Sequence, residues 1–466
     1  MSSRYDLVVI GAGPAGESAA ELAAFFGRSV VIVEKNKPGG VVTTTGGAPT
    51  KTLRESMLVW TGFHDREVYG VTVLSRPLLA IEKIAERTRQ VAKLLQDVTA
   101  ENIDRNGIEY MQGTAKIDSD QRVLVTTHGG EHHVLLAKNI LVATGSRPFH
   151  PDNIPFKDPN VWDSSEFFSP GRRLPKSIFI VGGGPVGVEF ATIFAGLGVP
   201  TTISDSAKRL IQSMDGEMSK LLAKHLERIG VDVILGCTTT EIRRVNGKLK
   251  VTLTNGRLFH PDAVLFAAGR SVNTDGLGLE TAGVELDDRG RIKVDHNYKT
   301  TANGIYAAGD VLGPSLASNA MEQGRIAACK MFNIKLKGTV DPTPVYAVYS
   351  MPEVAGVGLT EEQCRLQGLN YSVGRSDLSL IPRGAIAGHG GILKLIFNKN
   401  DRRLLGVHCF GDIASELVGI GQMVIHFKGT INTFMQVTLN TPTYTYAYKY
   451  AAIDGIRKLG VLKQKH

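Results

Sequence analysis

The feature that most constrains this chain is a repeated pattern of an apolar strand, a glycine-rich turn, a helix and a second apolar strand. The pattern runs over residues 5–34 and begins again over residues 177–205. Its two glycine turns, Gly11–Gly16 and Gly182–Gly187, start 171 residues apart. Apolar strands joined through a helix are typical of βαβ units in a parallel sheet. The sequence therefore predicts an α/β fold that contains this unit twice.

The first turn has the spacing of a dinucleotide-binding site. It consists of Gly11, Ala12, Gly13, Pro14, Ala15 and Gly16. In such a turn Gly11 bends the chain, Gly13 lets a pyrophosphate approach the backbone, and Gly16 allows close helix–strand packing. The helix start offers free N–H groups to the anion, and Glu34, at the end of the next strand, can accept hydrogen bonds from ribose hydroxyls. A Rossmann-like dinucleotide-binding domain is predicted here.

The second turn repeats these features and predicts a second Rossmann-like domain. It contains Gly182, Gly184 and Gly187, and Asp205 ends its next strand. A carboxylate at this position favours NAD, because it repels the 2′-phosphate of NADP. Lys208 and Arg209 follow closely and are able to accept such a phosphate. The use of NAD, NADP or both therefore stays open.

Composition narrows the class of protein. The 466 residues are too many for one core and predict about three domains. The net charge of +8 comes from scattered lysines and arginines, which argues against nucleic-acid binding. No apolar stretch is long enough for a membrane span, and the first strand begins at Asp6, so no signal segment is expected. Four dispersed cysteines indicate a reducing compartment, and a cytoplasmic protein is expected.

Other segments predict structure rather than chemistry. Charged helical periodicity predicts an exposed helix over residues 77–106, and two apolar runs predict a hairpin over residues 393–408. Residues 131–133 (Glu-His-His), with His128 nearby, have the composition of a metal site but are expected at a solvated hairpin tip. Cys409 is expected to be a buried small apolar residue rather than a nucleophile.

Six motifs occur in a characteristic order along the chain. They are Gly11–Gly16, Pro49–Lys51, Ala143–Gly145, Gly182–Glu189, Ala268–Arg270 and Ala308–Asp310. Over essentially the whole chain this order resembles the FAD-dependent pyridine nucleotide–disulfide oxidoreductases. The resemblance implies a glutathione-reductase-like fold: an FAD domain (residues 1–150 and 271–340), an NAD(P) domain (151–270) and an α+β C-terminal dimerisation domain (341–466). It also implies a homodimer.

The same resemblance implies roles for individual residues. FAD would occupy the first site and NAD(P) the second. Asp310 would bind the ribityl chain of FAD, and the main chain at Ala115 and Ala317 would contact it. Lys51 would lie beside the reactive flavin nitrogen with Glu189 as its ion-pair partner, so these two are the predicted catalytic residues. The remaining cofactor-binding positions in the motifs are Pro14, Ala15, Thr144, Gly145, Gly269 and Arg270.

Two parts of the family's thiol machinery are missing. Val42 and Gly47 stand where the family has its pair of redox-active cysteines, and neither can form a disulfide or a thiolate. In the C-terminal segment Thr441 and Tyr446 stand where the reductases have the His and Glu of their acid/base pair, and neither titrates near neutral pH. The loss of both parts argues against disulfide reductase activity.

The path that remains leads from NAD(P)H to FAD and on to a small acceptor. It resembles that of the family's transhydrogenases, so the predicted reaction is NADPH + NAD⁺ → NADP⁺ + NADH. One alternative is an NAD(P)H:quinone reductase, with the acceptor pocket lined by Tyr444, Tyr446, Tyr448 and Tyr450, although packing in a dimer interface explains these tyrosines more simply. Another is a non-catalytic flavin and NAD(P)H redox sensor.

Overall fold

The computed structural model describes residues 3–61, 77–118, 121–166, 173–336 and 343–460, which divide into two compact units. The first unit comprises Met1–Thr52, Ile81–Phe149 and Gly269–Asp341. The second comprises Leu53–Ala80, His150–Ala268 and Pro342–His466. Two unit boundaries fall within the helices α3 (Ala48–Thr61) and α4 (Pro77–Arg105).

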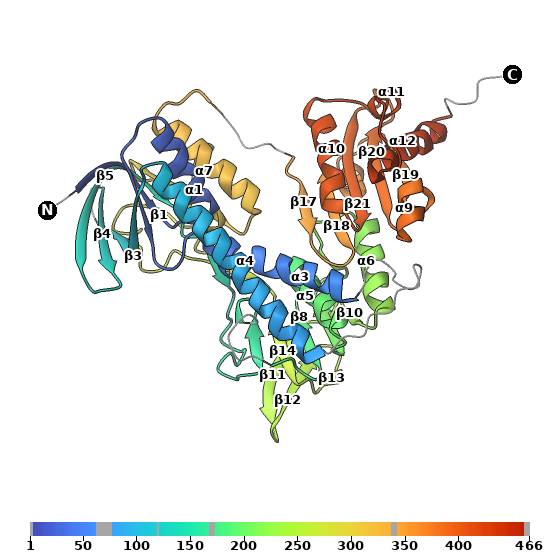
Figure 1. Cartoon of the computed structure of the whole chain (residues 1–466), viewed down its shortest axis with the longest axis horizontal. Helices are drawn as coiled ribbons and strands as arrows, with labels where there is room; N and C mark the ends of the chain where they lie inside the picture. Colours follow the sequence, from blue (N-terminus) through green and yellow to red (C-terminus); the bar gives the residue numbers. More distant parts are fainter. Residues whose placement is uncertain (1–2, 62–76, 119–120, 167–172, 337–342, 461–466) are drawn as a thin grey trace. The chain divides into compact units, whose positions relative to one another are not determined.

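The first unit is built on a largely parallel sheet (Figure 1). Its strands are β1 (Ser3–Ile10), β2 (Val30–Glu34), β3 (Glu109–Ile117), β4 (Arg122–Thr127), β5 (His132–Val142) and β16 (Ile305–Ala307). Strand β1 pairs in parallel with β2 and β5, while β3, β4 and β5 form an antiparallel extension. Helices α1 (Pro14–Phe25) and α7 (Ala317–Met331) lie side by side. A short pair, β6 (Ser146–Pro148) and β15 (Arg270–Val272), and a 3-10 turn, η3 (Asp310–Leu312), complete the unit.

The middle of the chain repeats this plan in the second unit. A parallel sheet has the order β10-β9-β8-β14-β7. Its strands are β7 (Val161–Asp163), β8 (Ile178–Val181), β9 (Thr201–Asp205), β10 (Asp232–Leu235) and β14 (Ala263–Phe266). The helices are α5 (Pro185–Gly196) and α6 (Gly216–Arg228). Strands β11 (Thr239–Val245), β12 (Lys248–Leu253) and β13 (Leu258–Phe259) form a separate antiparallel sheet.

The C-terminal part of the second unit is an antiparallel sheet with the order β17-β18-β21-β20-β19. Its strands are β17 (Tyr346–Val348), β18 (Glu353–Gly358), β19 (Tyr371–Asp377), β20 (Ile392–Asn398) and β21 (Leu404–Gly411). The helices are α8 (Glu361–Leu366), α9 (Pro382–Ala387), α10 (Ala414–His426), α11 (Thr433–Gln436) and α12 (Ala447–Lys458). The 3-10 turns η4 (Leu378–Leu380) and η5 (Tyr444–Tyr446) also belong to this part, whereas the short helix α2 (Gly40–Thr44) belongs to the first unit.

The two parts of the second unit share a core. Buried Phe190, Phe194 and Met218 belong to the same apolar cluster as Val354 and Phe410. Burial of this area from water stabilises the contact between the mid-chain and C-terminal sheets. The predicted separation of residues 151–270 from residues 341–466 as domains therefore stays a prediction.

A buried ion cluster adds a polar contact between the same two parts. The ammonium of Lys394, which is 1% exposed, lies 2.8 Å from Asp215 Oδ1, 3.0 Å from Glu217 Oε2 and 2.5 Å from Glu361 Oε2. Burial of a charge is tolerated where partners and hydrogen bonds compensate for lost hydration. This cluster fixes the start of α6 against β20 and α8.

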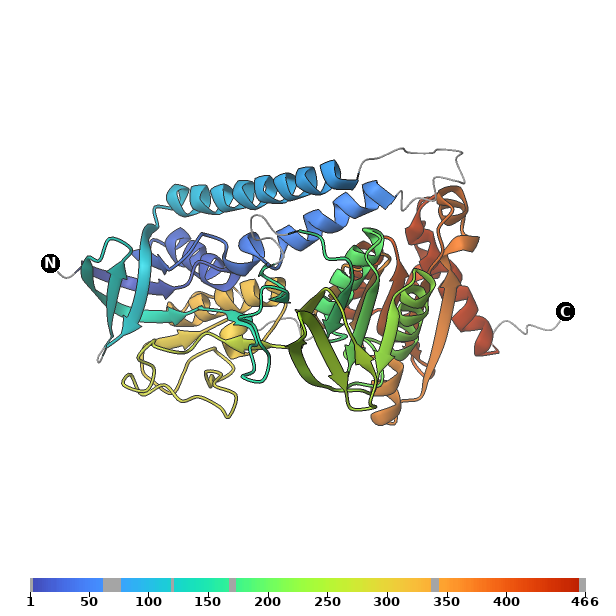
Figure 2. The same ribbon diagram turned by 90° about the horizontal axis from the view of Figure 1, so that it is seen from below.

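The predicted elements agree with the structure at several points. The predicted α/β fold and the repeat of the strand–turn–helix–strand unit are confirmed. The helix expected over residues 77–106 is α4, which has 29 residues (Figure 2). The expected hairpin is β20–β21, whose strands pair in antiparallel register. No helix among the described residues is long and apolar enough to cross a membrane.

Two candidate dinucleotide sites without a thiol pair

The first glycine turn is shaped to receive an anion. Gly11 has a φ of +108° between β1 and α1, and a Cβ there would lie 2.8 Å from the carbonyl carbon of Ala143. Gly13 is the N-cap of α1, and no described atom lies within 4 Å of its Cβ position. Pro14 follows in the first turn, and no described side chain caps the helix. The start of α1 therefore has no side-chain cap and has space beside Gly13, which are the two features that pyrophosphate binding requires.

Glu34 lies beside this turn and is 8% exposed. Its Oε2 accepts a hydrogen bond from the backbone N–H of Ala12 at 2.8 Å, and its Oε1 accepts one from Asn36 at 2.7 Å. Each carboxylate oxygen has two lone pairs, so acceptor capacity remains for ribose hydroxyls. The geometry fits the predicted role of Glu34 in holding the adenine ribose of a dinucleotide.

The second turn has the same construction. Gly182 has a φ of +113°, Gly184 is the N-cap of α5, and no described atom lies within 4 Å of the Cβ position of Gly184. Asp205 accepts a short hydrogen bond from Gly183 N–H through Oδ2, and one from Ala207 N–H at 2.7 Å through Oδ1. The hydrogen-bond pattern of Glu34 therefore recurs in the second unit.

The helices of the two sites approach their own glycine turns equally closely. A Cβ on Gly16 would overlap the carbonyl oxygen of Gly11. A Cβ on Gly187 would overlap the carbonyl oxygen of Gly182. Only glycine therefore fits at these two positions without moving the helix away from its strand.

The two cations that follow Asp205 differ in their surroundings. Lys208 is exposed. Arg209 is held, with Nη1 3.0 Å from Glu362 Oε1 and with Nη2 donating to the carbonyl of Gln212 at 2.8 Å. Lys208 is therefore accessible to a 2′-phosphate, as expected. Arg209 would first have to leave Glu362.

A polar cluster surrounds Asp310 in the first unit. The hydroxyl of Ser146 donates to Asp310 Oδ2 at 2.7 Å, and the backbone N–H of Ser315 donates to Oδ1 at 2.9 Å. Arg270 Nε donates to Ser146 Oγ at 2.7 Å and lies 3.9 Å from Asp310 Oδ2. The structure thus places Arg270, with Gly269 before it, in the first unit beside Asp310.

Other predicted residues of the first site lie around this cluster. Thr144 Oγ1 donates to the carbonyl of Asn273 at 2.6 Å, which holds Gly145 and its neighbours in place. Gly309 has a φ of +81°, and its Cβ position is 3.1 Å from Ala15 Cβ, so the turn before Asp310 packs on α1. Ala317 is the first residue of α7, which no described side chain caps. Ala115 lies in β3, opposite Val125 of β4.

Sequence reasoning missed two residues of this site. Ser146 directly follows the motif Ala143–Gly145, and Asn273 lies three residues after Arg270. Their hydrogen bonds connect segments 164 and 129 residues apart. The signal in the sequence that could have identified both residues was their closeness to a motif.

The two positions that lack cysteine lie against each other. Val42 is in α2, and a Cβ on Gly47 would lie 2.6 Å from the carbonyl oxygen of Val42. The fold thus brings these positions together without sulfur at either. All four cysteines of the chain lie in the described ranges and are free, and burial raises the pKa of the Cys409 thiol. The expected buried, unreactive Cys409 is 0% exposed.

The two predicted catalytic residues lie on different elements. Lys51 is in α3, where its N–H donates to the carbonyl of Gly47 at 3.3 Å. Glu189 is in α5, is 6% exposed, and its Oε1 accepts a hydrogen bond from Tyr349 N–H at 3.1 Å. Lys51 belongs to the first unit and Glu189 to the second, so their ion pair stays a prediction.

The C-terminal tyrosines do not form one surface. Tyr444 and Tyr446 lie in η5, and α12 begins at Ala447. Tyr448 is 0% exposed, donates to the carbonyl of Leu417 at 2.7 Å and accepts from Gly421 N–H at 3.0 Å. The expectation that all four tyrosines share a pocket or a dimer interface is therefore wrong for Tyr448, which is a core residue.

The histidine-rich hairpin is also a surface feature. The chain turns between β4 and β5, and His133 Nε2 lies 3.5 Å from Glu131 Oε2. Within the described ranges, no group of three or more His, Cys, Asp or Glu side chains is placed to hold a metal ion. The expected solvated hairpin tip agrees with the exposed positions of Glu131 and His132.

Comparison with protein families gives two matches that cover most of the chain. Residues 5–324 match the family model of pyridine nucleotide-disulphide oxidoreductases. Residues 345–452 match the dimerisation domain of the same group. The expected homodimer is supported by this second match.

Curated relatives match over almost the full length. The chain is 37% identical over 464 residues to a soluble pyridine nucleotide transhydrogenase of Mycobacterium bovis, covering 99% of both chains. It is 36% identical over 461 residues to the protein of that name from Marinomonas sp., covering 98% of this chain and 99% of the relative.

Solved structures support the same fold. LpdA from Mycobacterium tuberculosis matches with a TM-score of 0.89 and 25% identity, over 97% of this chain and 99% of that chain. The HOCl-induced flavoprotein disulfide reductase RclA from Escherichia coli, in its Cu(II) complex, matches with a TM-score of 0.87 and 26% identity, over 99% of this chain and 100% of that chain. The predicted glutathione-reductase-like architecture is confirmed.

Proposed function

This chain belongs to the pyridine nucleotide-disulphide oxidoreductase family, and from that premise we propose that it is an FAD-dependent transhydrogenase, which transfers hydride from NADPH to NAD⁺ without a thiol. One observation carries the proposal. Two dinucleotide turns of matched geometry are intact, while Val42 and Gly47 fill the positions of the redox-active cysteines. The curated relatives at 36–37% identity are named for this reaction.

FAD is assigned to the first site, and this assignment gives its residues their roles. The N-terminus of α1 and the open space at Gly13 would hold the pyrophosphate, and Glu34 would hold the ribose. Asp310, fixed by Ser146 and Ser315, would bind the ribityl hydroxyls. When bound, FAD supplies the two-electron acceptor and donor that connects two nicotinamide nucleotides.

The second site would bind NADPH and NAD⁺ in turn. Asp205 would bind the adenine ribose, and the space at Gly184 would take the pyrophosphate. One site used twice needs no separate acceptor pocket. Lys51 would stabilise negative charge as it develops during hydride transfer, and Glu189 would hold the Lys51 ammonium in place. The proposed domains are residues 1–150 with 271–340 for FAD, 151–270 for NAD(P), and 341–466 for dimerisation.

A cytoplasmic location is part of the proposal. All four cysteines are free, three of them almost fully buried. Thiols persist in reducing compartments, where NADPH and NAD⁺ are both available as substrates.

Half-reactions test the proposed activity. The FAD-loaded protein is reduced anaerobically with NADPH and then mixed in separate stopped-flow experiments with thio-NAD⁺, a quinone and oxidised glutathione. We expect fast reoxidation of the flavin by thio-NAD⁺ and none by the disulfide. Reoxidation by the quinone alone would replace the proposal with a quinone reductase, and no reoxidation by any of the three would replace it with a redox sensor.

A further inference from the structure

A transhydrogenase that uses one nucleotide site twice has to accept both a ribose 2′-hydroxyl and a 2′-phosphate there. Asp205 favours the hydroxyl and repels the phosphate. A cation that approaches only when the phosphate is present resolves this conflict. The inference below rests on the proposed function, because only a protein that uses both nucleotides needs such a residue.

Arg209 lies in a short loop that folds onto the second glycine turn. Asp205, where the loop begins, accepts a hydrogen bond from Gly183 N–H, and Ile211 N–H, where it ends, donates to the Gly183 carbonyl at 2.9 Å. Leu210 Cδ2 lies 2.7 Å from the Cβ position of Gly183. Both ends of this loop are therefore fixed at the ribose end of the site.

Arg209 is held by a partner that is itself at the surface. Its Nη1 lies 3.0 Å from Oε1 of Glu362, in α8, and the two side chains are 35% and 34% exposed. Side chains exposed to this degree are not fixed by core packing, and a surface ion pair contributes little to stability. Arg209 is therefore able to leave Glu362 at the cost of one surface ion pair and of its hydrogen bond to the Gln212 carbonyl, 2.8 Å from Nη2, and a stronger anion compensates for both.

Glu362 keeps stabilising contacts when Arg209 is absent. Its Oε1 also accepts the N–H of Gly216 at 3.1 Å, at the positive end of α6. A Cβ on Gly216 would overlap Oε1 of Glu362 and lie 2.9 Å from Arg209 Nη1, so glycine makes room for the pair. Burial raises the pKa of Glu362, but its own backbone N–H and Arg209 bring the pKa below the usual range, which keeps the carboxylate charged.

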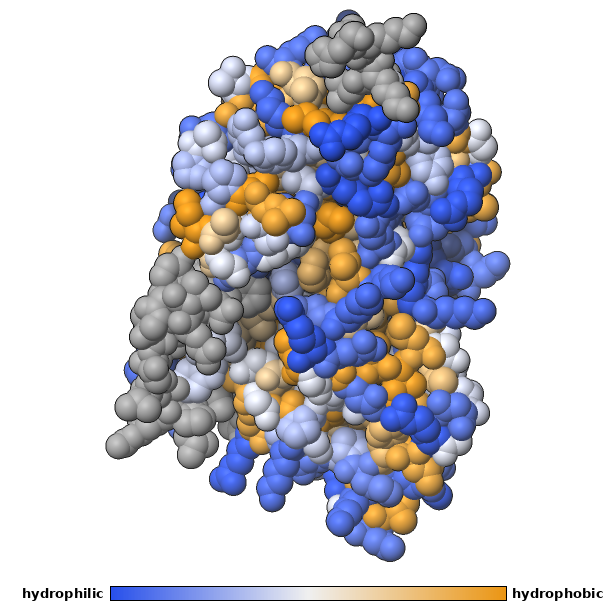
Figure 3. All heavy atoms as spheres, turned by 90° about the vertical axis from the view of Figure 1, so that its right-hand side faces the viewer, coloured by the Kyte–Doolittle hydropathy of each residue, from blue (hydrophilic) through white to orange (hydrophobic). Residues whose placement is uncertain are grey.

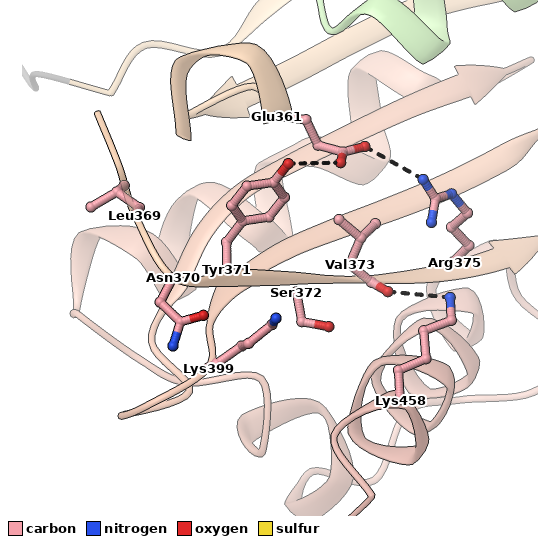
Figure 4. A pocket seen from close by; sticks show the side chains of 9 residues that line it. All are labelled: Glu361, Leu369, Asn370, Tyr371, Ser372, Val373, Arg375, Lys399 and Lys458. Atoms are coloured by element: carbon pink, nitrogen blue, oxygen red, sulfur yellow. Dashed lines mark hydrogen bonds and ion pairs between the residues drawn. The ribbon is translucent and has the colours of Figure 1, made fainter. Parts of the chain in front are cut away.

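The neighbouring acid is committed elsewhere. In Figure 4, Glu361 lies between the hydroxyl of Tyr371, at 3.2 Å, and the guanidinium of Arg375, at 3.4 Å. Glu361 also contacts Lys394 at 2.5 Å. Of these two consecutive acids of α8, Glu362 alone is seen paired with Arg209.

We propose that Arg209 is a two-position residue, paired with Glu362 when NAD(H) is bound and with the 2′-phosphate when NADP(H) is bound, and that Glu362 is the positioning residue that sets the balance. The guanidinium keeps an anionic partner in both positions, and a phosphate dianion attracts it more strongly than a carboxylate. A C-terminal residue thereby tunes the nucleotide preference of the mid-chain site.

Ligands without a nicotinamide ring test this exchange by binding alone. The dissociation constants of ADP-ribose and 2′-phospho-ADP-ribose are measured by calorimetry on the FAD-loaded protein. We expect Arg209→Gln to weaken the binding of 2′-phospho-ADP-ribose about tenfold and the binding of ADP-ribose less than about twofold. We expect Glu362→Gln to tighten the binding of 2′-phospho-ADP-ribose by about threefold and to leave the binding of ADP-ribose unchanged.

Matched variants make the outcome decisive. Arg244→Gln removes another arginine–carboxylate pair of the same unit, with Asp158, and is expected to change neither constant. Arg209→Lys keeps the charge and is expected to retain part of the affinity for 2′-phospho-ADP-ribose. This variant also tests the inference if Arg209→Gln does not fold. Unchanged ADP-ribose affinity shows that a variant is folded.

Three results would overturn the inference. The first is an equal loss of affinity for both ligands in Arg209→Gln. The second is an unchanged affinity for 2′-phospho-ADP-ribose in Glu362→Gln. The third is that Lys208→Gln, and not Arg209→Gln, weakens the binding of 2′-phospho-ADP-ribose. The outcome is separate from that of the proposed function. If both ligands bind as expected but thio-NAD⁺ does not reoxidise the flavin, the transhydrogenase proposal fails and the two-position arginine stands.

Discussion

The first and second glycine turns share one hydrogen-bond plan and differ in the acidic side chain that completes it. In the first turn Glu34 reaches the N–H of Ala12, and in the second the shorter Asp205 reaches the N–H of Gly183. A Cβ at residue 183 would lie 3.1 Å from Asp205 Cβ. Leu210 Cδ2 lies closer still, at 2.7 Å, so Leu210 and Asp205 together leave no room for a side chain at residue 183, whereas residue 12 beside the longer Glu34 is an alanine.

The surroundings of the two turns differ as well. The first unit adds Asp310, Ser146 and the uncapped start of α7 to its dinucleotide turn. The second adds a loop with two cations, one of which is paired with Glu362. Additional fixed contacts favour a cofactor that stays bound, and a surface loop favours nucleotides that exchange. We therefore expect the dinucleotide in the first site to stay bound longer than the one in the second.

Paired glycine variants give the largest expected effect. Gly16→Ala should abolish flavin retention, because its Cβ would overlap Gly11 O and separate α1 from the turn. Gly187→Ala should leave the protein yellow but slow reduction by NADPH by about a hundredfold, while dithionite still reduces it. Absorbance at 450 nm and stopped-flow reduction measure both effects.

A third glycine serves as control for this pair. The Cβ position of Gly129, in the β4–β5 turn, has Thr127 Oγ1 at an ordinary 3.8 Å. Gly129→Ala should therefore change neither property. Loss of flavin from Gly187→Ala, with Gly16→Ala still yellow, would reverse the assignment of the two sites.

The next effect tests whether both sites serve one hydride path. Lys51→Ala should slow flavin reduction by NADPH by about a hundredfold while FAD stays bound, because it removes the cation that we propose stabilises the developing negative charge. Lys248→Ala, at an exposed position in the second unit, is the control. Reduction of the Lys51→Ala protein at the wild-type rate would remove Lys51 from the mechanism.

A smaller effect tests the difference between the two acids. Gly183→Ala should weaken ADP-ribose binding by about tenfold, because the new methyl meets Leu210 and Asp205. Ala12→Gly should change FAD binding less than about threefold. Adding Asp205→Glu to Gly183→Ala copies the first turn and should recover part of the lost affinity. If the ADP-ribose affinity does not recover, the length of the acidic side chain does not explain why residue 183 is glycine.

How far the sequence predicted these sites depends on the range of the interactions. Gly11, Gly13 and Glu34 were predictable because a tight turn, an open backbone and a ribose acceptor are local requirements. Glu362 was not, because its contact with Arg209 spans 153 residues and depends on how the C-terminal sheet packs on α6. The burial of Tyr448 likewise depends on Leu417, Gly421 and Phe434, which its own segment does not reveal.

The residues of the dimer surface could not be predicted from the sequence either. Match to a dimerisation domain indicates that the C-terminal part pairs with a second copy. Large apolar side chains are exposed there in the single chain, among them Met423, Phe427, Met435 and Val437. Figure 3 shows hydrophobic areas between hydrophilic ones on one face of the molecule. Composition alone did not identify which of these residues stay exposed.

The smallest expected effect separates the two units on acidification. Burial, with the neighbouring Arg228, lowers the pKa of His225 in the second unit from 6.5 to about 4. Between these values the unfolded chain binds a proton that the folded chain does not, so stability falls as pH falls through this window. Burial and Glu21 raise the pKa of Glu17 in the first unit, and burial raises the pKa of Glu353 in the second. Above the ordinary carboxyl pKa the folded chain keeps a proton on these groups that the unfolded chain loses, so both contribute stability as the pH falls, opposite to His225.

Calorimetry at pH 7 and pH 5 measures this difference. We expect the transition of the second unit to shift down by about 3 °C at pH 5, and His225→Gln to reduce that shift. A shift of equal size in His225→Gln would assign the acid sensitivity to other groups.

The central claim is that electrons pass between nicotinamide nucleotides through a flavin site that has no dithiol beside it. An anaerobic titration of the FAD-loaded protein with dithionite counts the electrons it accepts. We expect full reduction with one two-electron equivalent per FAD and no long-wavelength thiolate–flavin band. Uptake of a second equivalent, with such a band at the midpoint, would contradict it.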